Sequence, residues 1–269
     1  MIRALWSAAT GMQAQQTNMD VIADNLANVN TTGFKHSRTD FQDLLYANLR
    51  AAGSETSSAG TQLPVGIQLG HGVKVVSVGK DFTQGSGIAS SEDPMNVDMM
   101  VQGQGFFQIE LPNGETAYTR DGSFKKSSDG NIVTSDGYPL IGAQLGFDPN
   151  TTTGIVVQAS GSIDLKTSTP PGTSPNVGQI QLARFINPEG LTAIGNNLYK
   201  ESVASGVPQL GNPNTDGFGT IQQHYLEQSN VNMVTEMVNM ITTQRAYETG
   251  TKSIQTVDSM LNAVTSMKR

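Results

Sequence analysis

The sequence predicts an α+β fold in which N- and C-terminal helices pair as an α-helical coiled coil, with a central, mainly antiparallel β domain inserted between them. Apolar residues recur every three or four positions at both ends of the chain. In the middle, apolar and polar residues alternate, and Asn-Gly or Asp-Gly pairs interrupt them. We expect a helix over 1–33, an extended arm over 34–72, the β domain over 73–220 and a second helix over 221–269.

The N-terminal helix is predicted by a heptad pattern. At 1.5 Å per residue the heptad positions from Leu5 to Val29 span roughly 37 Å. Asn28, Asn30 and Gly33 tolerate the left-handed backbone that ends helices, and Phe34 follows as an apolar anchor. The a and d positions are apolar except for Gln15, and they are Leu5, Ala8, Met12, Gln15, Met19, Ile22, Leu26 and Val29.

The opposite face of this helix is rich in amides and poor in charge. Up to Asn30 the charged side chains are Arg3, Asp20 and Asp24, while Gln and Asn fill most polar positions. Hydrogen-bonded amides can be buried at lower cost than charges. We therefore expect the helix to pack on several sides, and we favour subunit packing over a purely internal helical hairpin.

The composition argues against several classes of protein. The chain has 269 residues, a net charge of -7 and 14% charged residues, and it has no basic patch for nucleic acid. Because it has no Cys, a disulfide framework and a thiolate metal site are excluded. No apolar run is long enough to cross a membrane, and the N-terminus lacks the continuous apolar core of a cleavable signal peptide.

The arm is predicted in three pieces. Residues 51–60 are small and polar and predict a flexible loop, whereas residues 62–73 mix Gly with apolar residues and predict an extended, closely packed segment. Before them, one or two helical turns are expected from the spacing of Phe41, Leu44, Leu45 and Leu49.

The β domain is predicted by alternation, which begins at Val73, and by turns. Further strands are expected at 107–111, 116–120, 131–135, 155–159, 163–166 and 179–186. Turn dipeptides lie among them at Asn113-Gly114, Asp121-Gly122, Asp129-Gly130 and Asp136-Gly137. This density of turns predicts an antiparallel meander, in a barrel or a sandwich interrupted by loops such as 167–177.

The C-terminal helix is predicted to begin near Ile221. Its outer face is again rich in amides, and two such helices at opposite ends of one chain should pair with each other. The residues that recur at threes and fours, with one gap of seven, are Leu226, Met233, Met237, Met240, Gln244, Tyr247, Thr251, Ile254, Val257, Leu261 and Val264.

Motifs in three parts of the chain resemble those of a known family. The stretch Asn25-Leu26-Ala27-Asn28-Val29-Asn30-Thr31-Thr32-Gly33-Phe34-Lys35 resembles the N-terminal signature of the rod and hook proteins of the bacterial flagellum. Ser229 to Asn232, Glu236 to Ile241 and Gln244 to Glu248 resemble the C-terminal signature. Gly103 to Phe107 and Tyr118 to Phe124 resemble motifs of the family's β domain. Length and the arm make the distal rod type the most similar within the family.

The resemblance implies a structural, self-assembling subunit of a helical homopolymer in the flagellar basal body. It implies export without a cleavable signal peptide and a rod that crosses the periplasm. The implied partners are proximal rod proteins, the hook protein and the surrounding ring proteins, with no nucleic acid, no membrane insertion and no cofactor. The arm would stiffen contacts between neighbouring subunits, which would make the rod a straight drive shaft.

Subunit packing is expected to use apolar residues of both helices and of the arm. These residues are Leu5, Met12, Met19, Ile22, Leu26, Val29, Phe34, Leu63, Ile67, Leu69, Met233, Met237, Met240, Tyr247, Ile254 and Leu261.

Two alternatives stay open: another flagellar axial component, namely a proximal rod or hook protein, or a hydrolase or cell-wall binding module on a helical stalk. An enzyme would need titratable groups gathered in a pocket, and the sequence suggests none. His36, His71 and His224 lack metal-ligand spacing. Gly103-Gln104-Gly105 departs from a dinucleotide fingerprint because a strand follows it. We therefore predict no catalytic, cofactor-binding or metal-binding residue.

Overall fold

The computed structural model describes residues 2–53, 64–93, 96–144, 152–167, 176–215 and 217–267. It is an α+β structure that divides into two compact units. The helical unit contains Met1–Ala27, Ser37–Lys80 and Asn232–Arg269, and the β unit contains Asn28–His36 and Asp81–Val231. No helix in the described part of the chain is both long and apolar enough to span a membrane.

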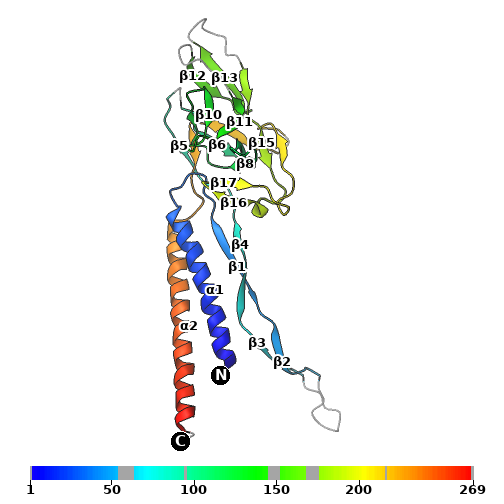
Figure 1. Ribbon diagram of the computed structural model, residues 1–269, viewed down its shortest axis with the longest axis vertical. Helices are drawn as coiled ribbons and strands as arrows, with labels where there is room; N and C mark the ends of the chain where they lie inside the picture. The colour runs from blue at the N-terminus through cyan, green and yellow to red at the C-terminus, as the bar shows by residue number, and fades with distance from the viewer. Residues whose placement is uncertain are drawn as a thin grey trace. The chain divides into compact units, whose positions relative to one another are not determined.

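Two long helices lie side by side and antiparallel in the helical unit, α1 (Ile2–Ala27) and α2 (Met233–Met267) (Figure 1). α2 begins after Asn232, whose side-chain oxygen accepts hydrogen bonds from the backbone N–H groups of Val234 and Thr235 at 3.1 and 3.2 Å. An asparagine in this position satisfies donors that have no partner inside the helix, which fixes where the helix starts.

The rest of the helical unit is a two-stranded antiparallel ribbon. β1 (Ser37–Asp43) pairs with β4 (Val73–Lys80), and β2 (Tyr46–Arg50) pairs with β3 (Ile67–Gly70) (Figure 1). The prediction of one or two helical turns between Phe41 and Leu49 is therefore wrong, because β1 and β2 are strands. A short apolar run fits either structure, and here strand pairing decides, since Phe41 lies opposite Val75 and Ala47 opposite Leu69. The alternation from Val73 is confirmed as a strand, but that strand pairs with β1.

The β unit is built from short antiparallel strands. Its largest sheet has the order β16-β17-β8-β7-β11-β10-β9, a second has the order β12-β13-β14, and β15-β18, β19-β6 and β20-β5 form pairs. A 3-10 turn lies at Pro188–Gly190. The strands are β5 (Gly87–Ala89), β6 (Met99–Gln102), β7 (Phe107–Glu110), β8 (Thr116–Thr119), β9 (Lys125–Lys126), β10 (Asn131–Val133), β11 (Pro139–Gln144), β12 (Thr152–Val157), β13 (Ser162–Thr167), β14 (Asn176–Gln179), β15 (Leu182–Arg184), β16 (Thr192–Gly195), β17 (Leu198–Lys200), β18 (Gln209–Gly211), β19 (Thr220–Gln223) and β20 (Tyr225–Glu227).

Three of the four predicted turn dipeptides join neighbouring strands. Asn113-Gly114 connects β7 to β8, Asp129-Gly130 connects β9 to β10, and Asp136-Gly137 connects β10 to β11. The glycine, which is the second residue of each dipeptide, has a φ of 79°, 79° and 87°, respectively. Asp121-Gly122 is different, because β8 and β9 are not neighbours in the sheet. Most of loop 167–177 lies outside the described residues.

The expected helix start at Ile221 is also wrong. Residues from Thr220 to Glu227 form β19 and β20, and the helix begins at Met233. Ile221 pairs with Val101 of β6 and is 2% exposed. Its burial in the sheet outweighs the helical spacing of the apolar residues that follow it. The core around Ile221 contains fully buried Met99, Phe107, Ile109, Leu140 and Ile163.

Candidate functional site

A buried ion pair lies in the β unit between Lys35, which follows α1 in the chain, and Glu227, the last residue of β20. Lys35 Nζ lies 2.6 Å from Glu227 Oε1 and donates a second hydrogen bond to Thr83 O at 2.8 Å. The two side chains are 0% and 1% exposed. The backbone N–H of Gly85 donates to the same carboxylate oxygen at 3.0 Å. The pair therefore joins the segment after α1 to the last strand before α2.

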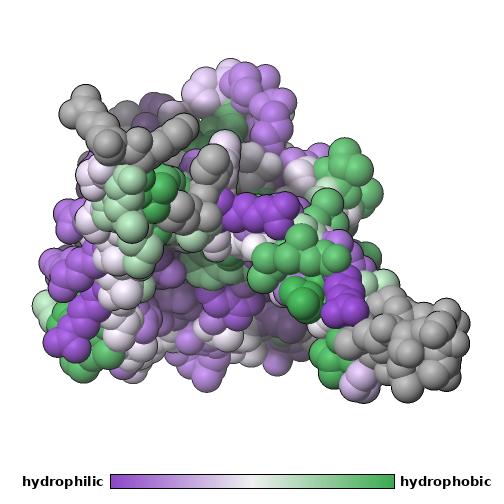
Figure 2. Space-filling model, turned by 90° about the horizontal axis from the view of Figure 1, so that it is seen from below, coloured by the Kyte–Doolittle hydropathy of each residue, from purple (hydrophilic) through white to green (hydrophobic). Residues whose placement is uncertain are grey.

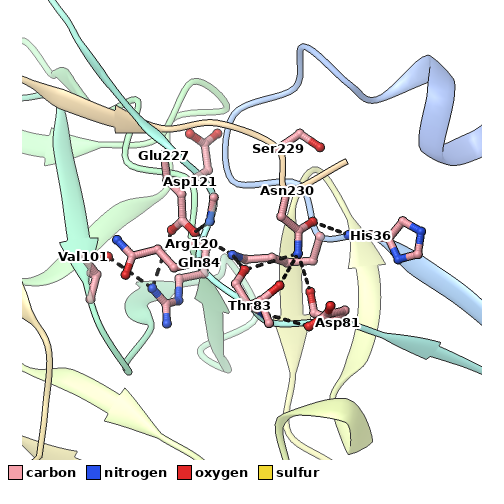
Figure 3. Close-up of polar contacts among 12 residues, drawn as sticks. His36, Asp81, Thr83, Gln84, Val101, Arg120, Asp121, Glu227, Ser229 and Asn230 are labelled. Carbon is pink, nitrogen blue, oxygen red and sulfur yellow. Dashed lines mark hydrogen bonds and ion pairs between the residues drawn. The ribbon is translucent and has the colours of Figure 1, made fainter. Parts of the chain in front are cut away.

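Arg120 brings a second cation to this carboxylate (Figure 3). Its Nη1 lies 3.5 Å from Glu227 Oε2 and donates a hydrogen bond to Val101 O at 3.3 Å. Its Nη2 donates to Gly103 O at 2.7 Å, and the guanidinium lies 5.2 Å from the centre of the Phe106 ring. Carbonyl oxygens and an aromatic face thus supplement the single counter-charge.

Two buried cations share one carboxylate in this cluster. Burial lowers the pKa of both Lys35 and Arg120 through desolvation, and attraction to Glu227 opposes that shift. Desolvation also raises the pKa of nearby Tyr199 to about 12, so its phenol stays neutral. In the described part of the chain, Arg120 Nε and Glu227 Oε2 are buried polar atoms without a hydrogen-bond partner. The cluster is costly to desolvate, and its charge balance depends on Glu227.

The segment from Asn28 to His36 is held in the β unit by further hydrogen bonds. The backbone N–H of Gly33 donates to Glu227 O at 2.8 Å, and Thr32 Oγ1 donates to Asp121 Oδ1 at 2.9 Å. The side chain of Asn197 donates to Thr32 O at 2.9 Å. Gly33 has a φ of 68°, which favours glycine.

Asn230 ties the chain just before α2 to the same place (Figure 3). Its side-chain oxygen accepts a hydrogen bond from the backbone N–H of His36 at 2.7 Å. Its side-chain nitrogen donates to Asp81 O at 2.9 Å and to Thr83 O at 3.2 Å. Thr83 O therefore receives hydrogen bonds from both Lys35 and Asn230.

The cluster brings together the motifs that the sequence shows far apart. Lys35 ends the N-terminal signature, Arg120 lies in the motif from Tyr118 to Phe124, and Asn230 lies in the C-terminal signature. A cleft of about 500 Å³ lies beside Arg120 and is also lined by Phe106 and Arg184, and its lining residues form no nucleophile and base pair. Nor does the described chain group three metal-ligating side chains. The chemistry of this site is structural, since it fixes three chain segments to one another.

Replacing Gly33 with Ala should destabilise the β unit by about 2–4 kcal/mol. A Cβ at this position would lie 2.6 Å from the backbone nitrogen of Asp121, and the positive φ adds strain. Gly114→Ala is the control, because Gly114 has a φ of 79° but a Cβ added there would have no atom within 4 Å. Urea unfolding of both variants should show the larger loss for Gly33→Ala. Equal losses would mean that contact with Asp121 is unimportant.

The structure places the predicted packing residues in several environments. Ile22 and Phe34 are buried within the chain, at 4% and 6% exposure. Leu5, Met12, Met19, Leu26, Val29, Met240, Ile254 and Leu261 are half-buried, whereas Ile67, Leu69, Met233, Met237 and Tyr247 are exposed. Leu63 lies outside the described residues.

The expected heptad seam of α2 needs correction. Met233 and Met237 are 43% and 48% exposed, whereas Glu236 and Thr243 are 3% and 4% exposed. At Gly250 the helices approach closely, since a Cβ there would lie 2.7 Å from Met12 Cγ. The residues facing α1 include small and polar ones, which an apolar pattern does not find.

Sequence reasoning also missed Lys35, Arg120 and Glu227. All three are charged residues in a chain with few charges, and Lys35 and Arg120 directly follow buried residues, Phe34 and Thr119. A charge inside an otherwise apolar or amide-rich motif is the local signal that could have drawn attention to them. Their mutual contact has no local signal, because Lys35 and Glu227 are far apart in sequence.

Family models match three parts of the chain. The model "Flagella basal body rod protein" matches residues 5–35, and "Flagellar hook protein FlgE/F/G D1 domain" matches residues 100–165. The model "Flagellar basal body rod FlgEFG protein C-terminal" matches residues 222–267. The three matches include all three cluster residues.

Relatives that match over the full length of the chain are also flagellar basal-body rod proteins. The chain is 47% identical to "Flagellar basal-body rod protein FlgG" of Caulobacter vibrioides, over 99% of this chain and 100% of that protein. It is 45% identical to the protein of the same name in Borreliella burgdorferi, over 100% of both chains. It is 42% identical to "Flagellar hook protein FlgE" of Helicobacter mustelae, but over 53% of this chain and 31% of that protein.

Proposed function

Because this chain belongs to the flagellar basal-body rod protein family, we propose that it builds the distal part of the rod as a helical homopolymer that transmits torque from the motor to the hook. The chain is a structural rod subunit and not an enzyme. In this proposal the polymer crosses the periplasm, with proximal rod proteins at one end, the hook protein at the other and ring proteins around it. Subunits reach the growing tip by type III export without a cleavable signal peptide.

The observation that carries the proposal is the exposed apolar surface of the helical unit. Val234, Val238 and Ile241 share one face of α2 and are 71%, 54% and 50% exposed. Met260 and Val264 are also exposed near the end of α2. Figure 2, in which the molecule is seen from below, shows hydrophobic areas open to solvent among hydrophilic ones. Monomers rarely leave such surface open unless another molecule covers it.

A coiled-coil pairing of α1 and α2 is part of the proposal. Starting from Glu236, alternating steps of four and three residues along α2 reach Met240, Thr243, Tyr247, Gly250, Ile254, Val257 and Leu261. This spacing is that of a heptad seam. Two antiparallel contacts support this pairing: Asn25 is hydrogen-bonded to Glu236, and Met12 lies close to Gly250. In the polymer, the paired helices line the inside of the tube, and the β unit forms an outer layer.

The sixteen predicted packing residues are divided between two roles in this proposal. The buried and half-buried ones hold the helices and the exit from α1 in place within a subunit. The exposed ones outside the seam, namely Ile67, Leu69, Met233 and Met237, contact neighbouring subunits, and Tyr247, which lies in the seam of α2, belongs to the first group. Leu63 is assigned to the second group on sequence grounds alone.

Electron microscopy of the purified full chain at increasing concentration tests the proposal. Straight tubes that form above a critical concentration are the expected result, because apolar burial between subunits drives assembly. Sedimentation on the same samples measures how much protein has polymerised. A chain that stays monomeric at every concentration contradicts self-assembly and supports the stalked-module alternative.

The arm should stiffen the polymer. Leu49 lies in β2, Leu45 directly precedes β2, and Val65 lies just before β3; they are 57%, 87% and 74% exposed. A two-stranded ribbon of this kind is marginally stable unless something covers it. We expect a change of all three to Ser to give polymers with a persistence length several-fold shorter, measured from electron micrographs. The control changes exposed polar residues of the same ribbon to Ser, namely Gln42, Asn48 and Gln68. Equal stiffness in both sets would refute this role.

A further inference from the structure

Asn25 of α1 joins two other elements of the helical unit at once. Its side-chain oxygen accepts a hydrogen bond from the backbone N–H of Ser37 at 2.8 Å, and its nitrogen donates to Ser37 O at 2.8 Å. The same nitrogen donates to Glu236 Oε2 of α2 at 3.3 Å. Asn25, Ser37 and Glu236 are 1%, 6% and 3% exposed. One buried amide thus makes hydrogen bonds to both β1 and α2.

Asn18, two turns earlier in α1, repeats the arrangement. Its side-chain nitrogen donates to Thr243 Oγ1 of α2 at 3.0 Å. Its side-chain oxygen accepts a hydrogen bond from Thr39 Oγ1 of β1. Thr39 and Thr243 are both buried. Again one amide joins β1 on one side and α2 on the other.

The spacing of these residues follows the periods of the three elements. Asn18 and Asn25 are seven residues apart in α1, and Glu236 and Thr243 are seven apart in α2, so each pair shares one helix face. Ser37 and Thr39 are two apart, so they share one face of β1. The two junctions therefore form a regular ladder along one line of contact.

From this ladder we propose that Asn18 and Asn25 are the residues that set the axial register of α1 against both α2 and β1. A buried polar residue in a helical seam typically specifies register at some cost in stability. Apolar contacts alone are weakly specific, since the seam offers similar side chains at successive turns. The proposal concerns the single chain and does not depend on assembly.

A slide by one turn shows what the amides exclude. It would move α2 by about 5.4 Å along α1. Asn25 would then face Met240 and Asn18 would face Tyr247, so neither amide would keep its present partner on α2. If α1 slid against both of its neighbours, the two amides would also leave Ser37 and Thr39 of β1. Burying such amides without partners is unfavourable, so the observed register is preferred.

Because the chain has no Cys, engineered disulfides can report the register directly. The pair Met12→Cys and Gly250→Cys reports the observed register, since a Cβ at Gly250 would lie 2.7 Å from Met12 Cγ. The pair Met12→Cys and Ile254→Cys reports a slide by one turn. Each pair is introduced into the full chain, oxidised and quantified on non-reducing gels. Each is compared with and without Asn18→Leu and Asn25→Leu, which keep side-chain volume but remove the amides.

With both asparagines present, we expect the Gly250 pair to cross-link and the Ile254 pair to stay near background. In the double leucine variant, the ratio of slid to native cross-link should rise about tenfold, as expected for losing a few buried hydrogen bonds. The exposed Gln16→Leu variant is the matched control and should leave the ratio unchanged. An unchanged ratio in the double variant overturns the proposal. If circular dichroism shows loss of helix in that variant, each single variant is tested, and an unchanged ratio in both overturns it equally.

Discussion

Glu227→Gln should lower the free energy of unfolding of the β unit by roughly 3–5 kcal/mol. The substitution keeps the shape of the side chain but removes the carboxylate that is ion-paired with both Lys35 and Arg120. Both cations would remain buried, at 0% and 4% exposure, without their ion-pair partner. Urea unfolding followed by near-ultraviolet circular dichroism measures the loss, because Tyr118 and Tyr199 are buried in this unit.

An exposed ion pair of the same unit provides the control. Lys200 Nζ lies 2.6 Å from Glu115 Oε1, the same distance as in the buried pair, but these side chains are 40% and 47% exposed. Glu115→Gln should cost less than about 1 kcal/mol, because water already solvates both charges. If the two variants unfold at the same urea concentration, burial of the cluster has no energetic consequence and our account of it is wrong.

Hydrogen exchange should locate the loss. The amides of Gly33 and Gly85 donate to Glu227 O and Glu227 Oε1, so both should exchange faster in Glu227→Gln. Amides of β12 and β13, which pair with each other elsewhere in the unit, should change less under conditions where local opening dominates. This pattern would show that the cluster holds the segment after α1 in place.

How far the sequence predicts this protein depends on the range of the interaction concerned. Heptad spacing predicted α1, because that pattern needs only neighbouring turns of one helix. Asn-Gly and Asp-Gly pairs predicted three hairpins, because a tight turn is set by its own residues. Local patterns gave the wrong structure at Phe41 and Ile221, where pairing with Val75 and Val101, respectively, decides the conformation.

The polar contacts were the least predictable part. The amide-rich face of α1 predicted packing on several sides, and Asn18 and Asn25 do contact both α2 and β1. Their partners Glu236 and Thr243 were missed, because an apolar pattern passes over them. The ion cluster combines residues from three separate segments, and no spacing rule predicts that they meet.

Val238→Asp should raise the critical concentration for polymerisation by about 100-fold or more. Val238 lies between Val234 and Ile241 on the exposed apolar face of α2, which we propose another subunit covers. Burying an unpaired carboxylate in such a contact costs several kcal/mol, and each 1.4 kcal/mol is about a factor of ten. The monomer should be nearly unaffected, because Val238 is 54% exposed and surface changes typically stay within about 0.5 kcal/mol.

Two controls separate this effect from a general change in α2. Val238→Ile keeps the apolar contact and should polymerise like the unmodified chain. Lys252→Asp adds the same carboxylate at an exposed position that already carries a charge, so its effect on the critical concentration should be much smaller. Sedimentation gives the critical concentration of each of the three variants and of the unmodified chain. Circular dichroism verifies that each monomer keeps its helix. Tubes from Val238→Asp at the unmodified concentration would show that this face stays in solvent, and the subunit contact would then have to be sought on the arm or on the β unit.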